Sequence, residues 1–169
     1  TGEMATLAPD KMKITYTTSA ADMDEIHAAF DEALEKVRSE CGREYPAYVN
    51  GVEVRSDLPP IVDASPIDTD VVLGEFTCAS AEQVDQAIEA AYQARRSWEK
   101  LGWRKRVAIM RKAAELIRQN KFELAACMSI EVGKNRLEAL GDAEESADLI
   151  DYYAWQMEDT DGFRQKMNN

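Results

Sequence analysis

Apolar residues recur at spacings of three and four along several stretches of the chain, a pattern typical of amphipathic helices. The first stretch follows Ser19-Ala20-Ala21-Asp22, where a hydroxyl cap with an acid three residues later indicates a helix N-terminus. Its apolar positions are Met23, Ile26, Phe30, Ala33, Leu34 and Val37. Gly42 is a natural C-cap, so the pattern predicts an N-terminal helix within residues 19–42.

Four further helices are predicted in the second half of the chain. Ser80-Ala81-Glu82-Gln83 is a capping box, and the helix behind it places Val84, Ala87, Ile88, Ala91 and Tyr92 on one face. After a short break at Gly102, the third helix carries Val107, Met110, Ala113, Ala114 and Ile117. The fourth covers Phe122 to Ile130 and ends near Gly133. The last runs from about Arg136 to Met157, with Leu140, Ala143, Ala147, Ile150 and Ala154 at helical spacing.

Short strands are predicted between the first and second helices. Tyr48 to Val54 indicates a hairpin, because Asn50-Gly51 between β-formers is the preferred two-residue turn. Residues 61–66 and 71–76 indicate two more strands, which a polar turn joins. The sequence shows neither a β-α-β alternation nor an internal repeat. The predicted fold class is therefore mainly α with a few short β-strands.

The composition narrows the classes of partner. The 169 residues are 45% hydrophobic, enough for one ordinary domain, and residues 1–18 lack an apolar period and are expected to form a flexible arm. The net charge of -12 disfavours nucleic acid and anionic membranes as partners. Apolar runs fall short of the roughly 20 residues that a membrane span needs. Thr1 to Asp10 lack the basic start and apolar core of a signal peptide.

The cysteines and the single histidine do not form a recognisable chemical pattern. Cys41, Cys78 and Cys127 are widely spaced and odd in number, which favours reduced thiols and a cytoplasmic protein. A catalytic thiol needs a helix N-terminus, a base or a cation beside it, and the sequence provides none of these for any of the three. His27 has no C-x-x-C or H-x-x-x-H partner, so no metal site is predicted.

Val132-Gly133-Lys134-Asn135 has the glycine and lysine of a phosphate-binding loop. Met128 stands where such a loop needs its earlier glycine, and Asn135 replaces the required hydroxyl. No G-x-G-x-x-G is present either. We therefore expect no nucleotide-binding element within this chain.

Charged residues cluster on the third and last predicted helices. Arg104, Lys105 and Arg106 lie in a first helical turn, where the helix dipole disfavours cations, so they are expected to be solvated or paired with nearby acids. The last helix carries Asp142, Glu144, Glu145, Asp148 and Asp151. Paired catalytic carboxylates are one interpretation of these acids, but a solvated helix face is favoured, as for most charge runs.

Three stretches resemble the aldehyde dehydrogenase family. Gly42-Arg43-Glu44-Tyr45-Pro46 with the Tyr48–Val54 segment is similar to the start of its bacterial 1-pyrroline-5-carboxylate dehydrogenase branch. Ser65-Pro66, Val72-Leu73-Gly74-Glu75, the Ser80 capping box and Trp98 with Trp103-Arg104-Lys105-Arg106 resemble the general N-terminal pattern of the family. Glu131-Val132-Gly133-Lys134-Asn135, Glu138-Ala139 and Asp142 to Asp148, leading to Tyr152-Tyr153-Ala154, resemble the family helix that ends in a paired aromatic.

The resemblance implies that residues 43–169 are the N-terminal segment of the α/β aldehyde dehydrogenase domain, without its Rossmann sheet and catalytic domain. The family's nucleophilic cysteine, general-base glutamate and dinucleotide site would lie beyond this segment. No catalytic, cofactor-binding or metal-binding residue is therefore assigned within the chain. In the family, the helix before the paired aromatic lines the aldehyde tunnel, which would bring Glu145 and, one turn earlier, Asp142 toward the substrate's ammonium group. We expect Glu145 to border the apolar stripe of this helix.

The implied function is that of the N-terminal part of an enzyme that uses NAD or NADP to oxidise L-glutamate γ-semialdehyde to glutamate in proline degradation. The implied partners are the small aldehyde, the rest of the dehydrogenase chain and further copies in a homo-oligomer. The segment alone would be inactive and would bind no cofactor. The alternative is a stand-alone helical interaction or oligomerisation domain without catalysis.

Overall fold

The computed structural model describes residues 20–164, so Ser19 and the arm expected at 1–18 lie outside the described residues. The elements in chain order are α1 (Ala20–Glu40), β1 (Arg43–Tyr45), β2 (Ala47–Val49), β3 (Val52–Val54), β4 (Ile61–Ala64), β5 (Val72–Phe76), α2 (Ala81–Lys100), α3 (Trp103–Gln119), α4 (Lys121–Val132) and α5 (Arg136–Asp159). The prediction of a mainly α fold with a few short strands is confirmed.

Local signals place the helix ends. The Ser80–Gln83 capping box is formed in both directions, because the Ser80 hydroxyl accepts from the Gln83 N–H while the Gln83 side chain accepts from the Ser80 N–H. Gly102 separates α2 from α3 with φ 78°, and Gly133 ends α4 with φ 75°, a left-handed conformation that favours glycine. Asn135 caps α5 by accepting from the Glu138 N–H at 3.0 Å.

The strands form two small sheets. β2 and β3 make the expected hairpin, and Asn50 and Gly51 both have positive φ, as its turn requires. The two strands expected at 61–66 and 71–76 are present as β4 and β5 and pair antiparallel, and β1 pairs parallel with the other edge of β5. The strand β1 has no counterpart among the predicted elements, because it is three exposed residues before Pro46, too short to show a period.

A close ring contact secures β1 on β5. The rings of Tyr45 and Phe76 stack with centroids 4.9 Å apart. A Cβ added to Gly74 would lie 2.6 Å from the Tyr45 ring, so only glycine leaves room for that ring. The Gly-Glu pair that carries part of the family resemblance therefore has a packing reason at its glycine.

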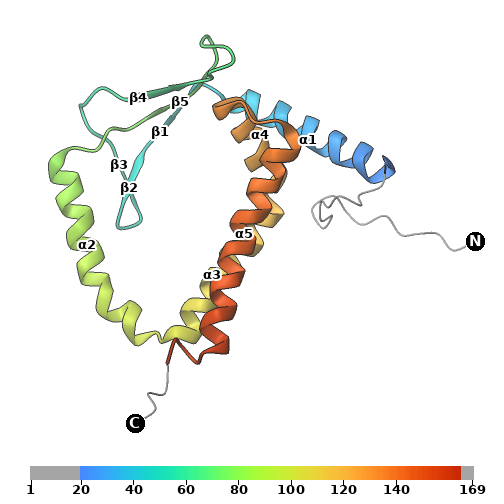
Figure 1. Ribbon diagram of the computed structural model, residues 1–169. Coiled ribbons are helices and arrows are strands. Elements are labelled where there is room, and N and C mark those ends of the chain that lie inside the picture. Colours follow the sequence, from blue (N-terminus) through green and yellow to red (C-terminus); the bar gives the residue numbers. More distant parts are fainter. Residues whose placement is uncertain (1–19, 165–169) are drawn as a thin grey trace, which may run out of the picture.

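The hydrophobic core lies where α1 crosses α4 and α5 (Figure 1). The apolar face predicted for the first helix is confirmed, since Ile26 and Phe30 are buried. The opposing helices contribute mostly alanine, which lets the backbones approach closely. The buried members on α4 and α5 are Ala125, Ala126, Ile130, Ala139 and Leu140.

The helix α2 stands apart from the α3–α5 pair, on the opposite side of the molecule (Figure 1). The apolar residues predicted for one face belong to α2, but within the described part of the chain no residue of α2 is buried. Val84, Ile88 and Tyr92 are 47%, 64% and 62% exposed. This face is therefore available to cover, or be covered by, another surface.

Candidate functional site

Three adjacent rows of side chains run along α5. A helix turns about 100° per residue, so positions four and then three residues apart share a face. The apolar row contains Ala143, Ala147, Ile150 and Ala154, of which the three alanines are buried against α3 and α4. The next row contains Glu144, Asp148 and Asp151. The third contains Glu145, Leu149 and Tyr152, all of them exposed.

Glu145 thus lies on the face of α5 opposite the buried alanines. The expectation that it would border the apolar stripe is wrong, because two successive 100° steps separate its row from that stripe. Its neighbours along the row, Leu149 and Tyr152, are each 50% exposed. No hydrogen bond or ion pair to another described residue engages the Glu145 carboxylate. Within the described part of the chain, the site is therefore an acid without an ion pair, beside an apolar and an aromatic side chain.

Asp142 does not share this open setting. Its carboxylate accepts from the Lys134 ammonium, and both side chains are partly buried. Lys134 belongs to the Gly-Lys-Asn turn that leads into α5, so the pair ties the start of the helix to its second turn. Of the two acids assigned to a substrate tunnel, only Glu145 is free of an ion pair within the described residues.

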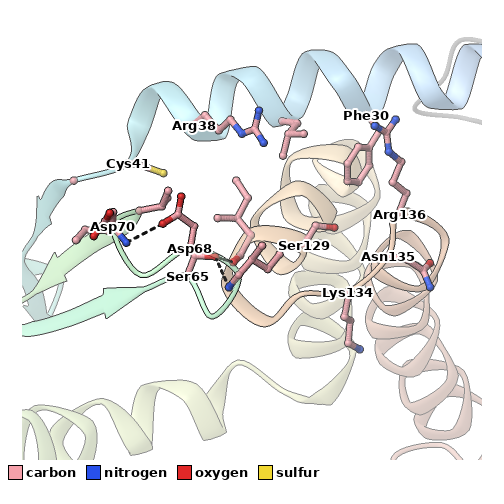
Figure 2. A pocket seen from close by; sticks show the side chains of 16 residues that line it. Phe30, Arg38, Cys41, Ser65, Asp68, Asp70, Ser129, Lys134, Asn135 and Arg136 are labelled. Atoms are coloured by element: carbon pink, nitrogen blue, oxygen red, sulfur yellow. Dashed lines mark hydrogen bonds between the residues drawn. The ribbon is translucent and has the colours of Figure 1, made fainter.

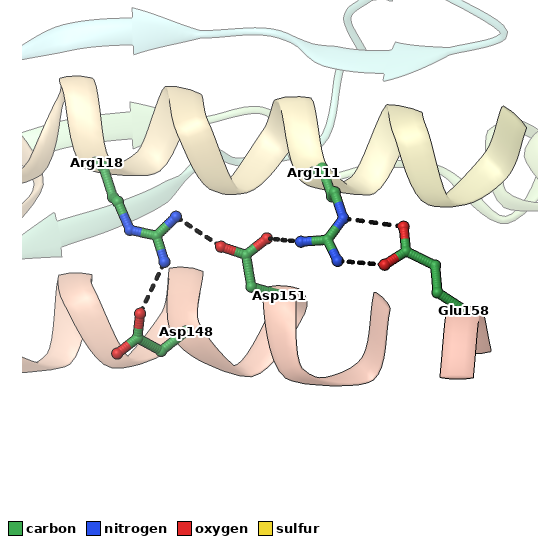
Figure 3. A network of polar contacts seen from close by, with 5 residues as sticks. All are labelled: Arg111, Arg118, Asp148, Asp151 and Glu158. Carbon is green, nitrogen blue, oxygen red and sulfur yellow. Dashed lines mark hydrogen bonds and ion pairs between the residues drawn. The ribbon is translucent and has the colours of Figure 1, made fainter. Parts of the chain in front are cut away.

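The other acids of α5 form a ladder of ion pairs with α3 and α4. Asp151 accepts from Arg111 at 3.0 Å and from Arg118 at 2.8 Å, as Figure 3 shows. Arg118 also donates to Asp148 at 2.7 Å, and the two outer contacts of Arg111 hold Glu158. The solvated face favoured for these acids is therefore wrong for the partly buried Asp151, whereas Asp148 pairs with Arg118 but stays exposed, at 51%.

Contacts within the ladder shift the pKa values of Arg111, Arg118 and Glu158. The hydrogen bond from Arg111 lowers the pKa of the Glu158 carboxyl, and the same contact raises the pKa of Arg111. Hydrogen bonding to Asp148 raises the pKa of Arg118. Arg111 and Glu158 thus each favour the charged form of the other.

Lys121 and Glu144 form the buried end of this ladder. The Lys121 ammonium donates to Glu144 at 2.8 Å, and the Lys121 side chain is only 1% exposed. Glu144 also lies 3.5 Å from Arg118, so the solvated setting favoured for it is wrong as well. Lys121 is a functional candidate that the sequence patterns do not single out. The one signal in the sequence is that Lys121 is the first residue of a helix, where the helix dipole disfavours a positive charge.

Two basic residues at the start of α3 have partners on either side of this helix in the chain. Arg104 pairs with Asp161 at 2.7 Å and lies over the Trp103 ring, as the expectation of nearby acids allowed. Arg106 instead donates to the carbonyls of Trp98 and Glu99 at the end of α2. These contacts join α2 to α3 across the Gly102 break.

The cysteines and His27 do not assemble into a reactive centre among the described residues. Cys127 is half-buried at the core cluster, and burial raises the pKa of its thiol, which disfavours the reactive thiolate. The Cys41 thiol donates to the Val37 carbonyl at 3.5 Å. Within residues 20–164 no group of His, Cys, Asp and Glu has metal-binding geometry. No helix of this part combines the length and apolar character needed to cross a bilayer.

A cleft of about 960 Å³ lies between α1, the β4–β5 loop and the start of α5 (Figure 2). Several of its polar groups are already bonded to protein: Ser65 donates to the Ile130 carbonyl, and Arg136 pairs with Asp31. Neither Glu145 nor Asp142 lines it. The cleft therefore does not contain the two residues that the sequence analysis assigned to substrate binding.

The described residues do not fit a dinucleotide. Such a site needs a glycine-rich turn that joins a parallel strand to a helix N-terminus. The parallel strand β5 is followed by Thr77 to Ser80 and then by a side-chain cap, with no glycine in the turn. Gly133 and Lys134 lead into α5, but they follow the helix α4 and not a parallel strand.

Comparison with known proteins gives a consistent result. Residues 54–169 match the model of the aldehyde dehydrogenase family. The chain is 37% identical over 135 residues to 1-pyrroline-5-carboxylate dehydrogenase 2 of Halalkalibacterium halodurans, covering 80% of this chain and 26% of that protein. It is 38% identical over 129 residues to 1-pyrroline-5-carboxylate dehydrogenase of Staphylococcus saprophyticus, covering 76% of this chain and 25% of the relative.

A solved structure agrees in fold. The 1-pyrroline-5-carboxylate dehydrogenase from Thermus with bound NAD matches with a TM-score of 0.75 and 35% identity, over 85% of this chain and 27% of the other. The chain therefore spans about a quarter of the length of the relatives it matches. The family match covers more than half of the chain, so this chain belongs to the aldehyde dehydrogenase family.

Proposed function

We propose that this member of the aldehyde dehydrogenase family is the N-terminal part of an enzyme that oxidises L-glutamate γ-semialdehyde to glutamate in proline degradation. The observation that carries the proposal is the similarity, at 37–38% identity over three quarters or more of the chain, to relatives named 1-pyrroline-5-carboxylate dehydrogenase. Residues 43–169 would form the N-terminal segment of the dehydrogenase domain, preceded by the helix within 19–42.

Glu145 is the residue of this chain that we assign to substrate. Its carboxylate stands on the open face of α5 without an ion pair to another described residue, so its charge is available to an incoming cation. An amino-acid aldehyde carries such a cation in its ammonium group. Leu149 and Tyr152 would border the hydrocarbon part of the substrate. Asp142, which Lys134 already neutralises, would contribute little.

NAD or NADP, bound elsewhere in the complete enzyme, would accept the hydride that leaves the aldehyde carbon. Residues 20–164 contain no element suited to a dinucleotide, so the proposal places cofactor binding and the nucleophile outside this segment. The segment alone would then be inactive. The NAD bound in the related Thermus structure supports NAD use in the family.

We further propose how this segment packs and assembles in the complete protein. The exposed apolar face of α2 would pack against the rest of the dehydrogenase chain, and the complete protein would be a cytoplasmic homo-oligomer without nucleic-acid or membrane partners. The same exposed face also fits a non-catalytic helical interaction domain. Intact mass separates the two, because only the interaction domain would exist in cells at 19.0 kDa.

The experiment that tests the proposal replaces Glu145 by glutamine in the complete dehydrogenase. Glu145→Gln keeps the shape and removes the charge, and the lost hydrogen bond to a charged group is worth roughly 1.5–3 kcal/mol. We expect kcat/KM for the amino-acid aldehyde to fall about ten- to a hundredfold, while a simple aliphatic aldehyde is oxidised as before. Glu138→Gln, two turns earlier on the exposed side of the same helix, is the matched control.

Two outcomes would contradict this assignment. Equal losses with both aldehydes would mean that Glu145 supports the fold. Unchanged kinetics with both aldehydes would mean that Glu145 is a solvated surface residue without a role in substrate binding.

A further inference from the structure

The row that faces the partner helices and the row that carries Glu145 are offset by one residue along α5. Glu144, Asp148 and Asp151 occupy the first row, and Glu145, Leu149 and Tyr152 occupy the second. Both rows begin with a glutamate. A rotation of α5 about its axis by part of a residue step of about 100° would turn Glu145 away from its open position. Contacts with α3 and α4 must therefore fix the rotation of this helix.

Apolar packing alone limits small rotations of α5 only weakly. The buried face of α5 consists largely of alanines, whose small and similar side chains give few distinctive contacts. Ion pairs have a direction and a fixed reach, so they discriminate between neighbouring rows better than alanine contacts do. The ladder from Lys121 to Glu158 meets only the first row.

Lys121 is the member of the ladder whose position most needs an explanation. Its ammonium is buried at the first turn of α4, where both desolvation and the helix dipole oppose a positive charge. A buried pair of this kind is often no more stable than two apolar side chains of similar volume. Stability is thus a weak reason for a lysine here, whereas fixing the orientation of α5 is a sufficient one.

The packing of α4 holds Lys121 in a fixed position. The next turn of α4 holds Ala125 and Ala126, which are completely buried in the core against α1. The ammonium therefore projects from a helix that is anchored in the hydrophobic core. It holds Glu144, the residue directly before Glu145, at 2.8 Å.

We propose that Lys121 is a positioning residue for substrate recognition: through its buried contact with Glu144 it fixes the rotation of α5 and thereby presents Glu145 to the ammonium group of an amino-acid aldehyde. The inference rests on the proposed function of Glu145. It assigns to Lys121 an effect on specificity without any contact with substrate.

The test uses the complete dehydrogenase and two aldehydes, one with an ammonium group and one simple aliphatic. Lys121→Met removes the charge and keeps the length of the side chain. We expect it to lower kcat/KM for the amino-acid aldehyde by about tenfold, since a displacement of an ångström can cost up to about a hundredfold, and to leave the aliphatic aldehyde unchanged. In a Glu145→Gln background Lys121→Met should have no further effect.

Two controls separate positioning from general support of the fold. Arg111→Met breaks the far end of the same ladder and should not alter the ratio of the two kcat/KM values. The double variant Lys121→Met/Glu144→Leu replaces the pair by apolar side chains and should recover thermal stability. Its kcat/KM for the amino-acid aldehyde should nevertheless stay low, because no ion pair between these two positions fixes the rotation of α5.

The proposal is overturned if Lys121→Met affects both aldehydes equally, if its effect multiplies with that of Glu145→Gln, or if the double variant recovers specificity together with stability. A loss on Glu145→Gln without a loss on Lys121→Met would refute this inference and leave the proposed function standing. No loss on Glu145→Gln would overturn both.

Discussion

The most direct physical consequence of the ladder is a large penalty for removing the Glu144 charge. Glu144→Gln keeps the shape of the side chain but leaves the Lys121 ammonium, 1% exposed, without its carboxylate at 2.8 Å. Removing one partner of a buried pair costs about 3–5 kcal/mol. Because Glu144 retains 14% exposure and Arg118 also contacts it, we expect a value near the lower end, about 3 kcal/mol.

The chain offers a matched control in Glu115→Gln. Glu115 pairs with Lys112 at 2.7 Å within α3, and both side chains are more than half exposed. Solvent-exposed pairs of this kind contribute only about 0–1 kcal/mol. The two substitutions remove the same group from pairs of similar length, so the difference between them isolates burial.

Amide hydrogen exchange of the complete protein measures the penalty locally. Peptides that cover α4 and the first half of α5 should exchange about a hundredfold faster in Glu144→Gln, since each 1.4 kcal/mol corresponds to about a factor of ten. Glu115→Gln should change its own peptide by less than about tenfold. Similar acceleration in the two variants would refute the view that the Lys121–Glu144 pair is energetically buried.

Three further outcomes are expected. The purified 169-residue chain should form no NADH from L-glutamate γ-semialdehyde, and formation above background would contradict the proposal that the cofactor binds outside this segment. Cys127 should react with an alkylating reagent at pH 7 more slowly than free cysteine, because burial raises the pKa of its thiol and lowers its thiolate fraction; faster labelling would refute this. The isolated chain should bind a dye that reports apolar surface, and Ile88→Asp, on the 64% exposed side chain of α2, should weaken that binding; a sharp two-state melt of a monomer without dye binding would count against it.

The elements of the fold were predictable wherever a local signal decided them. The capping box at Ser80, the break at Gly102 and the Asn50-Gly51 turn each fix backbone geometry through a few neighbouring residues. The strand β1 was not predictable, because its three residues are held by pairing with β5 and by the stacking of Tyr45 on Phe76, which are thirty-one residues apart.

The ion pairs of the acids on α5 were not predictable from the sequence, because their partners lie on other helices. Charge runs are usually solvated, and the sequence does not show which acids of this helix have arginine partners. The difference arises because α3 aligns Arg111 and Arg118 with one row of α5 and leaves the next row open. A rule was available for Glu145 itself, since helical spacing already places it opposite Ala147 and Ala154.

The intact mass of the polypeptide that carries this sequence in native cells tests most directly whether the segment is part of a dehydrogenase. We predict a single covalent chain several times heavier than 19.0 kDa, in keeping with relatives of which this chain spans about a quarter. A mass of 19.0 kDa in cells would contradict the proposed function and would favour a stand-alone helical interaction domain.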